Sequence, residues 1–292
     1  MQRWLLLLVA LCTLPAWAAP AGSSPVSFRR VVINGVRAYV VTVDLNCKRI
    51  ALVPLASNGR YKSFRRFIRE SRPLAAINGT FFDPRTATII CNLMAGGKLV
   101  SEGRVGHSLC VDLQNRARIV ATAGRAGRFL NLSQWAFGLS GGPTLLRSDQ
   151  YVLAPRSEGF RDPGLLGVAS RSALGVTAHN KLLLVTVKKP VRLQRLAWMM
   201  KSLGARDALN LDGGSSSALY VDGRFVTRPR RLLTNVVAVT LRPATTVSKV
   251  GPAPQVESPL FDPLPPAALE MPLAEAPADP DYVATAELEP RI

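Results

Sequence analysis

The segment from Ala208 to Ser217 combines a short apolar run with a carboxylate, two glycines and three hydroxyl groups. It reads Ala-Leu-Asn-Leu-Asp-Gly-Gly-Ser-Ser-Ser, so the apolar run ends at Asp212. The two glycines let the backbone turn tightly and point successive N–H groups toward one place, which suits an anion. The serine hydroxyls add donors for phosphate or sugar oxygens. The segment predicts an anion site with a carboxylate, and the simpler alternative is an Asp-Gly-Gly turn capped by serines.

A second segment, from Leu74 to Asp83, has the same design. Its apolar run ends at Asn78, and glycine, threonine and two phenylalanines follow. Two strand ends that deliver Asn78 and Asp212 would build a site at the carboxyl edge of a sheet, where rigid elements position the polar groups. We expect Phe81 and Phe82 in the core, with stacking on a sugar ring as the alternative.

Four motifs resemble, in the same order along the chain, those of phosphodiester glycosidases. They are Asn78-Gly-Thr-Phe-Phe, Gly141-Gly-Pro-Thr144, Ser170-Arg-Ser-Ala-Leu-Gly175 and Leu211-Asp-Gly-Gly-Ser-Ser-Ser217. The resemblance covers roughly residues 70 to 241. Thr80 departs from the glycine that is commoner in the first motif, and the segment from Cys91 to Val105 matches no motif.

This resemblance implies hydrolysis of a phosphodiester, whose transition state needs preorganised donors and a fixed cation. Asp212 is then the general acid or base, or the carboxylate that positions water. Asn78 orients substrate or stabilises developing charge. Arg171 is the expected cation, because its planar fork matches two phosphate oxygens, although a surface arginine is the alternative.

The resemblance also implies a set of substrate-binding residues. These are Gly213, Gly214, Ser215 and Ser216 in a phosphate cradle, Gly79 and Thr80 beside Asn78, and Gly142 and Thr144 in the adjoining wall. No cofactor is implied with certainty. A divalent cation held by Asp212 and backbone carbonyls is the metal site that the pattern allows.

The first residues indicate export. Arg3 precedes an apolar run from Trp4 to Leu11, and Ala16-Trp17-Ala18 has the small-x-small pattern of a cleavage site. We interpret residues 1–18 as a signal peptide; a membrane anchor is the alternative, but spanning a bilayer needs about 20 apolar residues. We therefore expect a secreted or periplasmic protein with no transmembrane span after cleavage.

The formal charge of +18 is unevenly distributed. From Pro252 onward, eight acidic residues and ten prolines accompany a single basic residue, Arg291. This composition predicts a disordered Pro-rich acidic tail at 252–292, after a catalytic domain at 19–251. The strongly basic domain favours polyanionic partners. Envelope glycans are preferred to nucleic acid, for which no motif of base recognition is present.

Short apolar runs separated by Gly, Asn, Asp and Ser predict many strands between Val26 and Pro243. Hairpin turns are expected at Gly96-Gly97, His179-Asn180 and Asp222-Gly223. Helical spacing predicts one helix that begins near Leu193 and stops at Gly204, and a second over Ser63 to Ser71. The predicted fold is α+β, with a mixed, strand-rich sheet core and a few flanking helices.

Cys47, Cys91 and Cys110 remain after the predicted cleavage. A Cys91–Cys110 bridge and a fully reduced core are both open. No ligand spacing indicates zinc. A structural role is expected for His107, with a catalytic role as the alternative, and His179 is expected to be solvated.

The leading hypothesis is an exported hydrolase of a sugar-1-phosphodiester in an envelope or extracellular glycan. The alternative is a non-catalytic binder of anionic cell-envelope glycan. Two arginine-rich stretches, Arg60 to Arg72 and Arg228 to Arg231, are candidates for contact with a polymeric substrate, or are solvated faces.

Overall fold

The computed structural model describes residues 24–123 and 131–242. The predicted signal peptide at 1–18 and the predicted tail at 252–292 lie outside the described residues, as do both ends of the predicted domain at 19–251. The described chain forms three antiparallel sheets and three α-helices. None of these helices has the length and apolar character that crossing a membrane requires.

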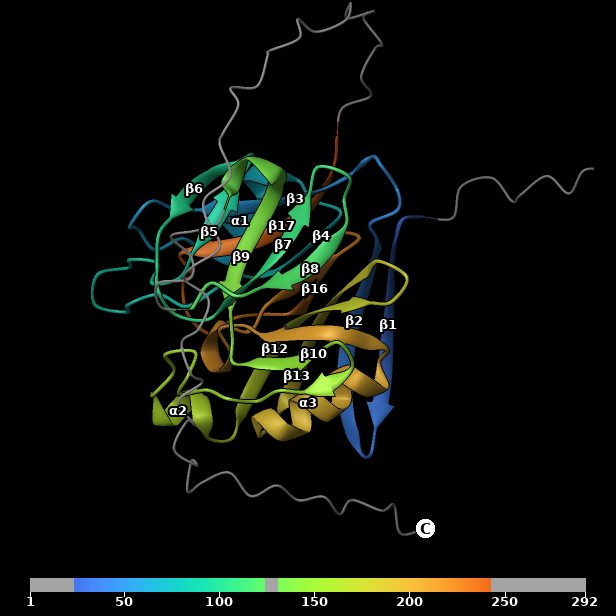
Figure 1. The fold of residues 1–292 in the computed structure, drawn as a ribbon, viewed down its shortest axis with the longest axis vertical. Helices are drawn as coiled ribbons and strands as arrows, with labels where there is room; N and C mark the ends of the chain where they lie inside the picture. The colour runs from blue at the N-terminus through green and yellow to red at the C-terminus, as the bar shows by residue number, and fades with distance from the viewer. Residues whose placement is uncertain (1–23, 124–130, 243–292) are drawn as a thin grey trace, which may run out of the picture. The chain divides into compact units, whose positions relative to one another are not determined.

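The first sheet has seven strands and lies in the lower half of Figure 1, with a helix beneath it. In spatial order its strands are β1 (Val26–Ile33), β2 (Val36–Asp44), β13 (Lys181–Val191), β12 (Ala169–Thr177), β14 (Ala205–Asn210), β10 (Thr144–Arg147) and β11 (Gln150–Tyr151). Helix α3 (Leu193–Ser202) covers the outer face and buries Leu196, Met199 and Met200 against apolar residues of the sheet. The short helix α2 (Pro163–Leu166) precedes β12.

The second sheet has five strands and carries helix α1 (Phe64–Ser71). Its order is β16 (Arg224–Thr227), β15 (Leu219–Val221), β4 (Ala75–Asn78), β17 (Asn235–Leu241) and β3 (Ile50–Ala56). The apolar side of α1, formed by Phe64, Phe67 and Ile68, packs with buried residues of this sheet.

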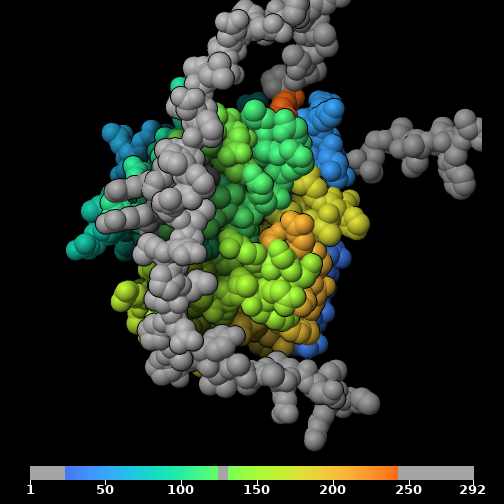
Figure 2. All heavy atoms as spheres, in the orientation of Figure 1, coloured from blue at the N-terminus to red at the C-terminus, as the bar shows by residue number. Residues whose placement is uncertain are grey.

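The third sheet also has five strands. Its order is β6 (Lys98–Ser101), β5 (Leu93–Ala95), β9 (Trp135–Gly141), β7 (His107–Asp112) and β8 (Ala117–Val120), and the single turn η2 (Leu132–Gln134) precedes β9. In Figure 2 the green surface of this sheet lies against the yellow-green surface of the residues that follow β9. The chain passes from the third sheet into the first directly after β9, because the next strand, β10, belongs to the first sheet.

One apolar core joins the three sheets. It contains Leu184 from β13, Ile77 from β4 and Leu139 from β9, all fully buried, together with residues from most of the other strands. Because each sheet buries one face in this shared core, the strands that end beside it are held rigidly relative to one another.

The structure confirms both predicted helices and the three predicted turns. Ser63 caps α1 by accepting a hydrogen bond from the backbone N–H of Arg66, and Gly204 follows α3 with φ +89°. Positive φ values occur at Gly96, Gly97, Asn180, Asp222 and Gly223, as tight hairpins require. The strand-rich core with few helices is also confirmed. Its sheets are not mixed, however, because every strand pairing among the described residues is antiparallel.

The three described cysteines are unbridged, so the structure follows the reduced alternative. Burial raises the pKa of the Cys91 thiol to about 11 and that of the Cys110 thiol to about 12. Both thiols are therefore protonated and unreactive at neutral pH.

Leu211 anchors the strand end that precedes Asp212, because its side chain is fully buried in the shared core. We predict that Leu211→Ala lowers the free energy of unfolding by about 2–5 kcal/mol, from lost burial and the cavity left behind. Chemical denaturation measures this change. The control is Leu113→Ala, whose side chain is 60% exposed, so that its effect should stay within about 0.5 kcal/mol. Equal effects of the two substitutions would contradict the placement of Leu211.

Candidate active site

The candidate site lies where the chain crosses from the first sheet to the second. Strand β14 ends at Asn210, residues 211–218 make the crossing, and β15 continues in the second sheet. Strand β4, a direct neighbour of β15, ends at Asn78 beside this crossing. The two motifs that the sequence singled out therefore meet, although their strands belong to different sheets.

Asn78 fastens both ends of the crossing. Its side-chain N–H donates to the carbonyl of Asp212 at 2.6 Å, and its side-chain oxygen accepts from the backbone N–H of Ala218 at 3.0 Å. Asn78 is 1% exposed, so its carboxamide serves the loop backbone. Both ends of the amide are engaged by the crossing, so the structure shows a positioning role for Asn78, and the expectation that it orients substrate or stabilises developing charge stays a prediction.

The Asp212 carboxylate pairs with Arg231. The Arg231 Nη2 atom donates to Asp212 Oδ2 at 2.7 Å, and its Nε atom donates to the Ser216 hydroxyl at 2.5 Å. The guanidinium also lies 4.5 Å from the centre of the Phe82 ring. The Asp212 side chain is 14% exposed, whereas that of Arg231 is 35% exposed and reaches solvent.

Burial raises the pKa of the Asp212 carboxyl group above its ordinary value, and the charge of Arg231 only partly offsets this effect. A raised pKa brings the titration of a carboxyl group closer to neutral pH, which favours a role as general acid or base. The pair thus combines a proton-exchanging group with a fixed cation that is partly open to solvent.

Arg171 is not the cation beside Asp212. It is 1% exposed, and its guanidinium donates to the backbone carbonyls of Val191 at 3.0 Å, Leu165 at 2.9 Å and Gly167. Its backbone does touch the crossing, since a Cβ added at Gly213 would lie 3.7 Å from the Arg171 Cα. Its guanidinium, however, binds carbonyls of the turn around α2 and so fastens β12 to that turn. Arg231 occupies the place that the sequence analysis assigned to Arg171.

Gly79 and Thr80 are held by Asn235, which the sequence analysis missed. The backbone N–H of Thr80 donates to the Asn235 side-chain oxygen at 2.7 Å, and the Asn235 amide donates back to the Thr80 carbonyl at 3.1 Å. A Cβ at Gly79 would lie 1.8 Å from that Asn235 oxygen, so no larger residue fits there. Nothing in the sequence pairs Asn235 with a segment 155 residues away.

Gly142 and Thr144 are shaped by a second missed residue, Glu158. The Thr144 N–H donates to both carboxylate oxygens, at 2.9 and 3.0 Å, and its hydroxyl donates at 2.9 Å. A Cβ at Gly142 would lie 2.4 Å from the Phe160 ring, so glycine is required here too. Phe160 in turn packs on Phe81, with ring centres 5.3 Å apart. Burial raises the pKa of Glu158, against the hydrogen bonds from Thr144.

The four residues of the predicted phosphate cradle follow Asp212 directly. Gly214–Ser216 form the single 3₁₀ turn η3, with Gly214 at φ +58°. Gly213 abuts the backbone of β12, where a Cβ would lie 2.7 Å from the Ser170 carbonyl oxygen. The Ser215 carbonyl accepts from the N–H of Arg230 at 2.7 Å, which holds the arginine segment against the turn.

Unpartnered polar atoms gather around this crossing. Among the described residues, five buried side-chain polar atoms lack a hydrogen-bond partner, and four belong to segments that meet here. The four are Thr80 Oγ1, Ser172 Oγ, Asn210 Oδ1 and Ser217 Oγ. Buried polar groups are normally satisfied, so a cluster of exceptions beside a buried carboxylate is a signature of a functional site.

The residues around Asp212 do not fit a divalent cation. No group of three or more His, Cys, Asp and Glu side chains in residues 24–123 and 131–242 could hold a metal ion. The Asp212 carboxylate faces a guanidinium, which opposes a second cation. His107 begins β7 opposite Gly141, and its Nδ1 atom accepts from the backbone N–H groups of Thr122 and Ala123 at 3.2 and 3.3 Å.

Three solved structures share this fold at low sequence identity. A hypothetical protein from Synechocystis matches with TM-score 0.61 and 18% identity, over 76% of this chain and 65% of that one. The catalytic domain of zebrafish N-acetylglucosamine-1-phosphodiester alpha-N-acetylglucosaminidase, auto-inhibited by its pro-peptide, matches with TM-score 0.62 and 18% identity, over 76% and 85%. A protein from Burkholderia pseudomallei matches with TM-score 0.52 and 16% identity, over 70% and 74%.

The chain thus spans less than two thirds of the length of the Synechocystis protein. No curated protein matches the chain. A family model described as phosphodiester glycosidase matches residues 71–240, which is more than half of the chain and includes all four sequence motifs. The chain belongs to the phosphodiester glycosidase family.

Proposed function

We propose that this protein is an exported hydrolase that cleaves a sugar-1-phosphodiester in an envelope or extracellular glycan. Membership of the family supports a hydrolase role on a phosphodiester-linked sugar. The observation that carries the proposal is the largely buried Asp212 carboxylate, paired with Arg231 at the crossing where segments that contain unpartnered hydroxyl and amide oxygens meet.

Arg231 has the chemistry of a phosphate-binding group. A guanidinium carries five N–H donors, and the Ser216 and Asp212 contacts use two of its nitrogens. Its partial exposure leaves the fork able to meet a diester from the solvent side. In the proposed reaction, Arg231 stabilises the charge that collects on the phosphate oxygens as the bond between the anomeric carbon and the phosphate oxygen breaks.

Asp212 acts on the proton of the attacking water. In its ionised form the carboxylate accepts this proton while the water oxygen bonds to the anomeric carbon and the bond to the phosphate oxygen breaks. The products are a free sugar and a phosphomonoester. Asn78 donates a hydrogen bond to the Asp212 carbonyl and so fixes the backbone that carries the carboxylate. General-base catalysis requires a carboxylate held in place in this way.

Asp212→Asn keeps the size of the side chain but removes proton exchange, so release of sugar from a synthetic sugar-1-phosphodiester should fall by at least about 10³-fold. The melting temperature, read in parallel, should change by only a few degrees. Equal activity in the variant would refute the role of Asp212. Absence of hydrolysis in the unmodified protein, with retained binding of an anionic glycan, would favour the non-catalytic binder.

The contact between Arg231 and Asp212 should control how kcat/KM depends on pH. Arg231 favours the ionised carboxylate, so Arg231→Gln raises the pKa of Asp212 further. Because the base is active when ionised, the acid limb of kcat/KM should move to higher pH, and the maximum should fall by about 10²–10³-fold. Lys98→Gln is the matched control, since it removes one exposed charge on β6. An unshifted acid limb in Arg231→Gln would contradict the coupling.

Export is tested on the full-length chain. The basic residue, the apolar run and the Ala16-Trp17-Ala18 pattern support cleavage after Ala18. When the complete chain is expressed in a bacterial host, mass spectrometry of the extracytoplasmic fraction should find an N-terminus at Ala19. Retention of Met1 on cytoplasmic protein would reject this part of the proposal.

A further inference from the structure

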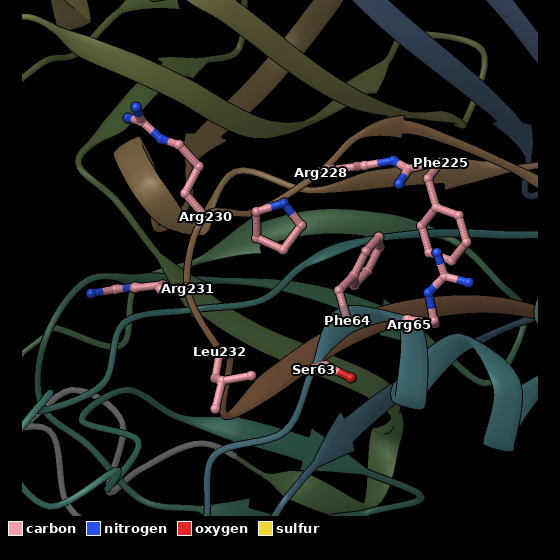
Figure 3. A pocket seen from close by; sticks show the side chains of 9 residues that line it. Ser63, Phe64, Arg65, Phe225, Arg228, Arg230, Arg231 and Leu232 are labelled. Carbon is pink, nitrogen blue, oxygen red and sulfur yellow. The ribbon is translucent and has the colours of Figure 1, made fainter.

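Three adjoining hollows lie along the segment from Gly223 to Leu232, which contains Arg231. Their volumes are about 420, 580 and 600 Å³. All three are lined in part by Phe225 and Arg228, so they adjoin one another, and we call the three together the depression. Figure 3 shows the hollow nearest to Arg231, with Arg65 and Arg228 beside Phe225 and with Arg230 and Arg231 pointing away from Phe64.

The charged residues that line the depression are all cationic, and no aspartate or glutamate lines it. We call these seven residues the basic track: Arg30, Arg65, Lys188, Arg224, Arg228, Arg230 and Arg231. Among the described residues, only Arg231 of the seven forms an ion pair. So many unneutralised charges of one sign produce a positive potential that attracts and retains a polyanion.

The basic track is continuous with the candidate active site. Arg231 belongs to both, through its contact with Asp212 at 2.7 Å. Gly214 and Ser217 line the same hollow as Arg228 and Arg230. A chain bound along the track would therefore reach the Asp212 turn without leaving the depression.

Two of the aromatic rings that line the depression, Phe225 and Tyr39, are already engaged by cations. Arg65 and Arg228 lie 5.4 and 5.6 Å from the centre of the Phe225 ring, and Lys188 lies 4.6 Å from that of Tyr39. Binding of single-stranded nucleic acid relies on aromatic faces that accept bases. Because cations occupy the faces of Phe225 and Tyr39, these contacts favour a ligand recognised by its regularly spaced charges over one recognised by stacking of its bases. Stacking also holds the arginine side chains in place, which reduces the entropy lost on binding.

We propose that the basic track binds the anionic chain that continues beyond the bond cleaved at Asp212, so that the preferred substrate is a poly(sugar phosphate) with several phosphodiesters. This inference rests on the proposed function and specifies its substrate class. A single diester meets Arg231 alone, whereas a polymer places its next phosphates on Arg228, Arg65 and Lys188.

The test compares a poly(glycosyl 1-phosphate) of about ten repeats with a single-unit diester of the same sugar. In Arg65→Gln/Lys188→Gln/Arg228→Gln, kcat/KM for the polymer should fall at least about tenfold relative to that for the single diester, mainly through KM. The logarithm of the polymer binding constant should also depend less steeply on the logarithm of the salt concentration, by about two for three lost contacts.

A charge-matched control is Lys98→Gln/Arg118→Gln/Lys201→Gln, whose three exposed residues lie on β6, β8 and α3, outside the track. It should leave the ratio of polymer to diester activity unchanged. An equal decrease in both triple variants would show a general effect of net charge and overturn the inference.

Binding of the same polymer is measured in the Asp212→Asn background, so that it does not depend on turnover. No loss of affinity from the track substitutions would overturn the inference, while hydrolysis of the single diester would still uphold the proposed function. A single-stranded DNA of equal charge that binds as tightly, with the same loss in the track variant, would overturn the assignment to a glycan. Polymer binding without hydrolysis of any diester would refute the proposed function alone.

Discussion

The buried charge of Asp212 is the constraint on which the rest of the site depends. A carboxylate removed from water is stable only when a counter-charge and hydrogen bonds replace its hydration. Arg231 supplies the counter-charge, and Asn78 fixes the backbone that carries the carboxylate. Because burial still raises the pKa of Asp212, this compensation is incomplete. The remaining imbalance leaves the group able to exchange a proton.

The three-sheet architecture explains how such a site can be rigid without regular secondary structure at its centre. Residues 211–218 belong to no strand and contain only the single 3₁₀ turn η3, but both of their ends are fixed. Leu211 inserts into the core shared by the sheets, and Ala218 is buried under α1. Asn78 then bridges the two ends from a third strand, so the turn behaves as part of the scaffold.

The sequence predicted the elements better than it predicted their partners. Apolar periodicity and turn residues located both longer helices, the hairpins, the strand end at Asn78 and, to within two residues, the strand end before Asp212, because these are local signals. The division into three antiparallel sheets depends on contacts between residues far apart along the chain. The same limit explains the exchange of Arg171 for Arg231: residue type suggested a phosphate-binding arginine, but only the fold decides which guanidinium faces the carboxylate.

The contacts of Asn235 and Glu158 show that the reason for a glycine can also depend on a residue far away along the chain. Gly79 and Gly142 stand in motifs that were predicted to bind substrate, yet in each case the space of the missing side chain is filled by the protein itself. The close approach lets Asn235 and Glu158 bind the backbone of Thr80 and Thr144.

The glycines of the Asp212 turn differ from these two. Gly213 meets the Ser170 carbonyl, whereas a Cβ on Gly214 would meet nothing within 4 Å. Gly214 also lines the hollow that carries Arg228 and Arg230. Of the glycines in the predicted substrate-binding set, Gly214 is therefore the one whose absent side chain leaves open space beside the cations. A bound phosphate can approach the backbone there, which joins the catalytic turn and the basic track into one surface.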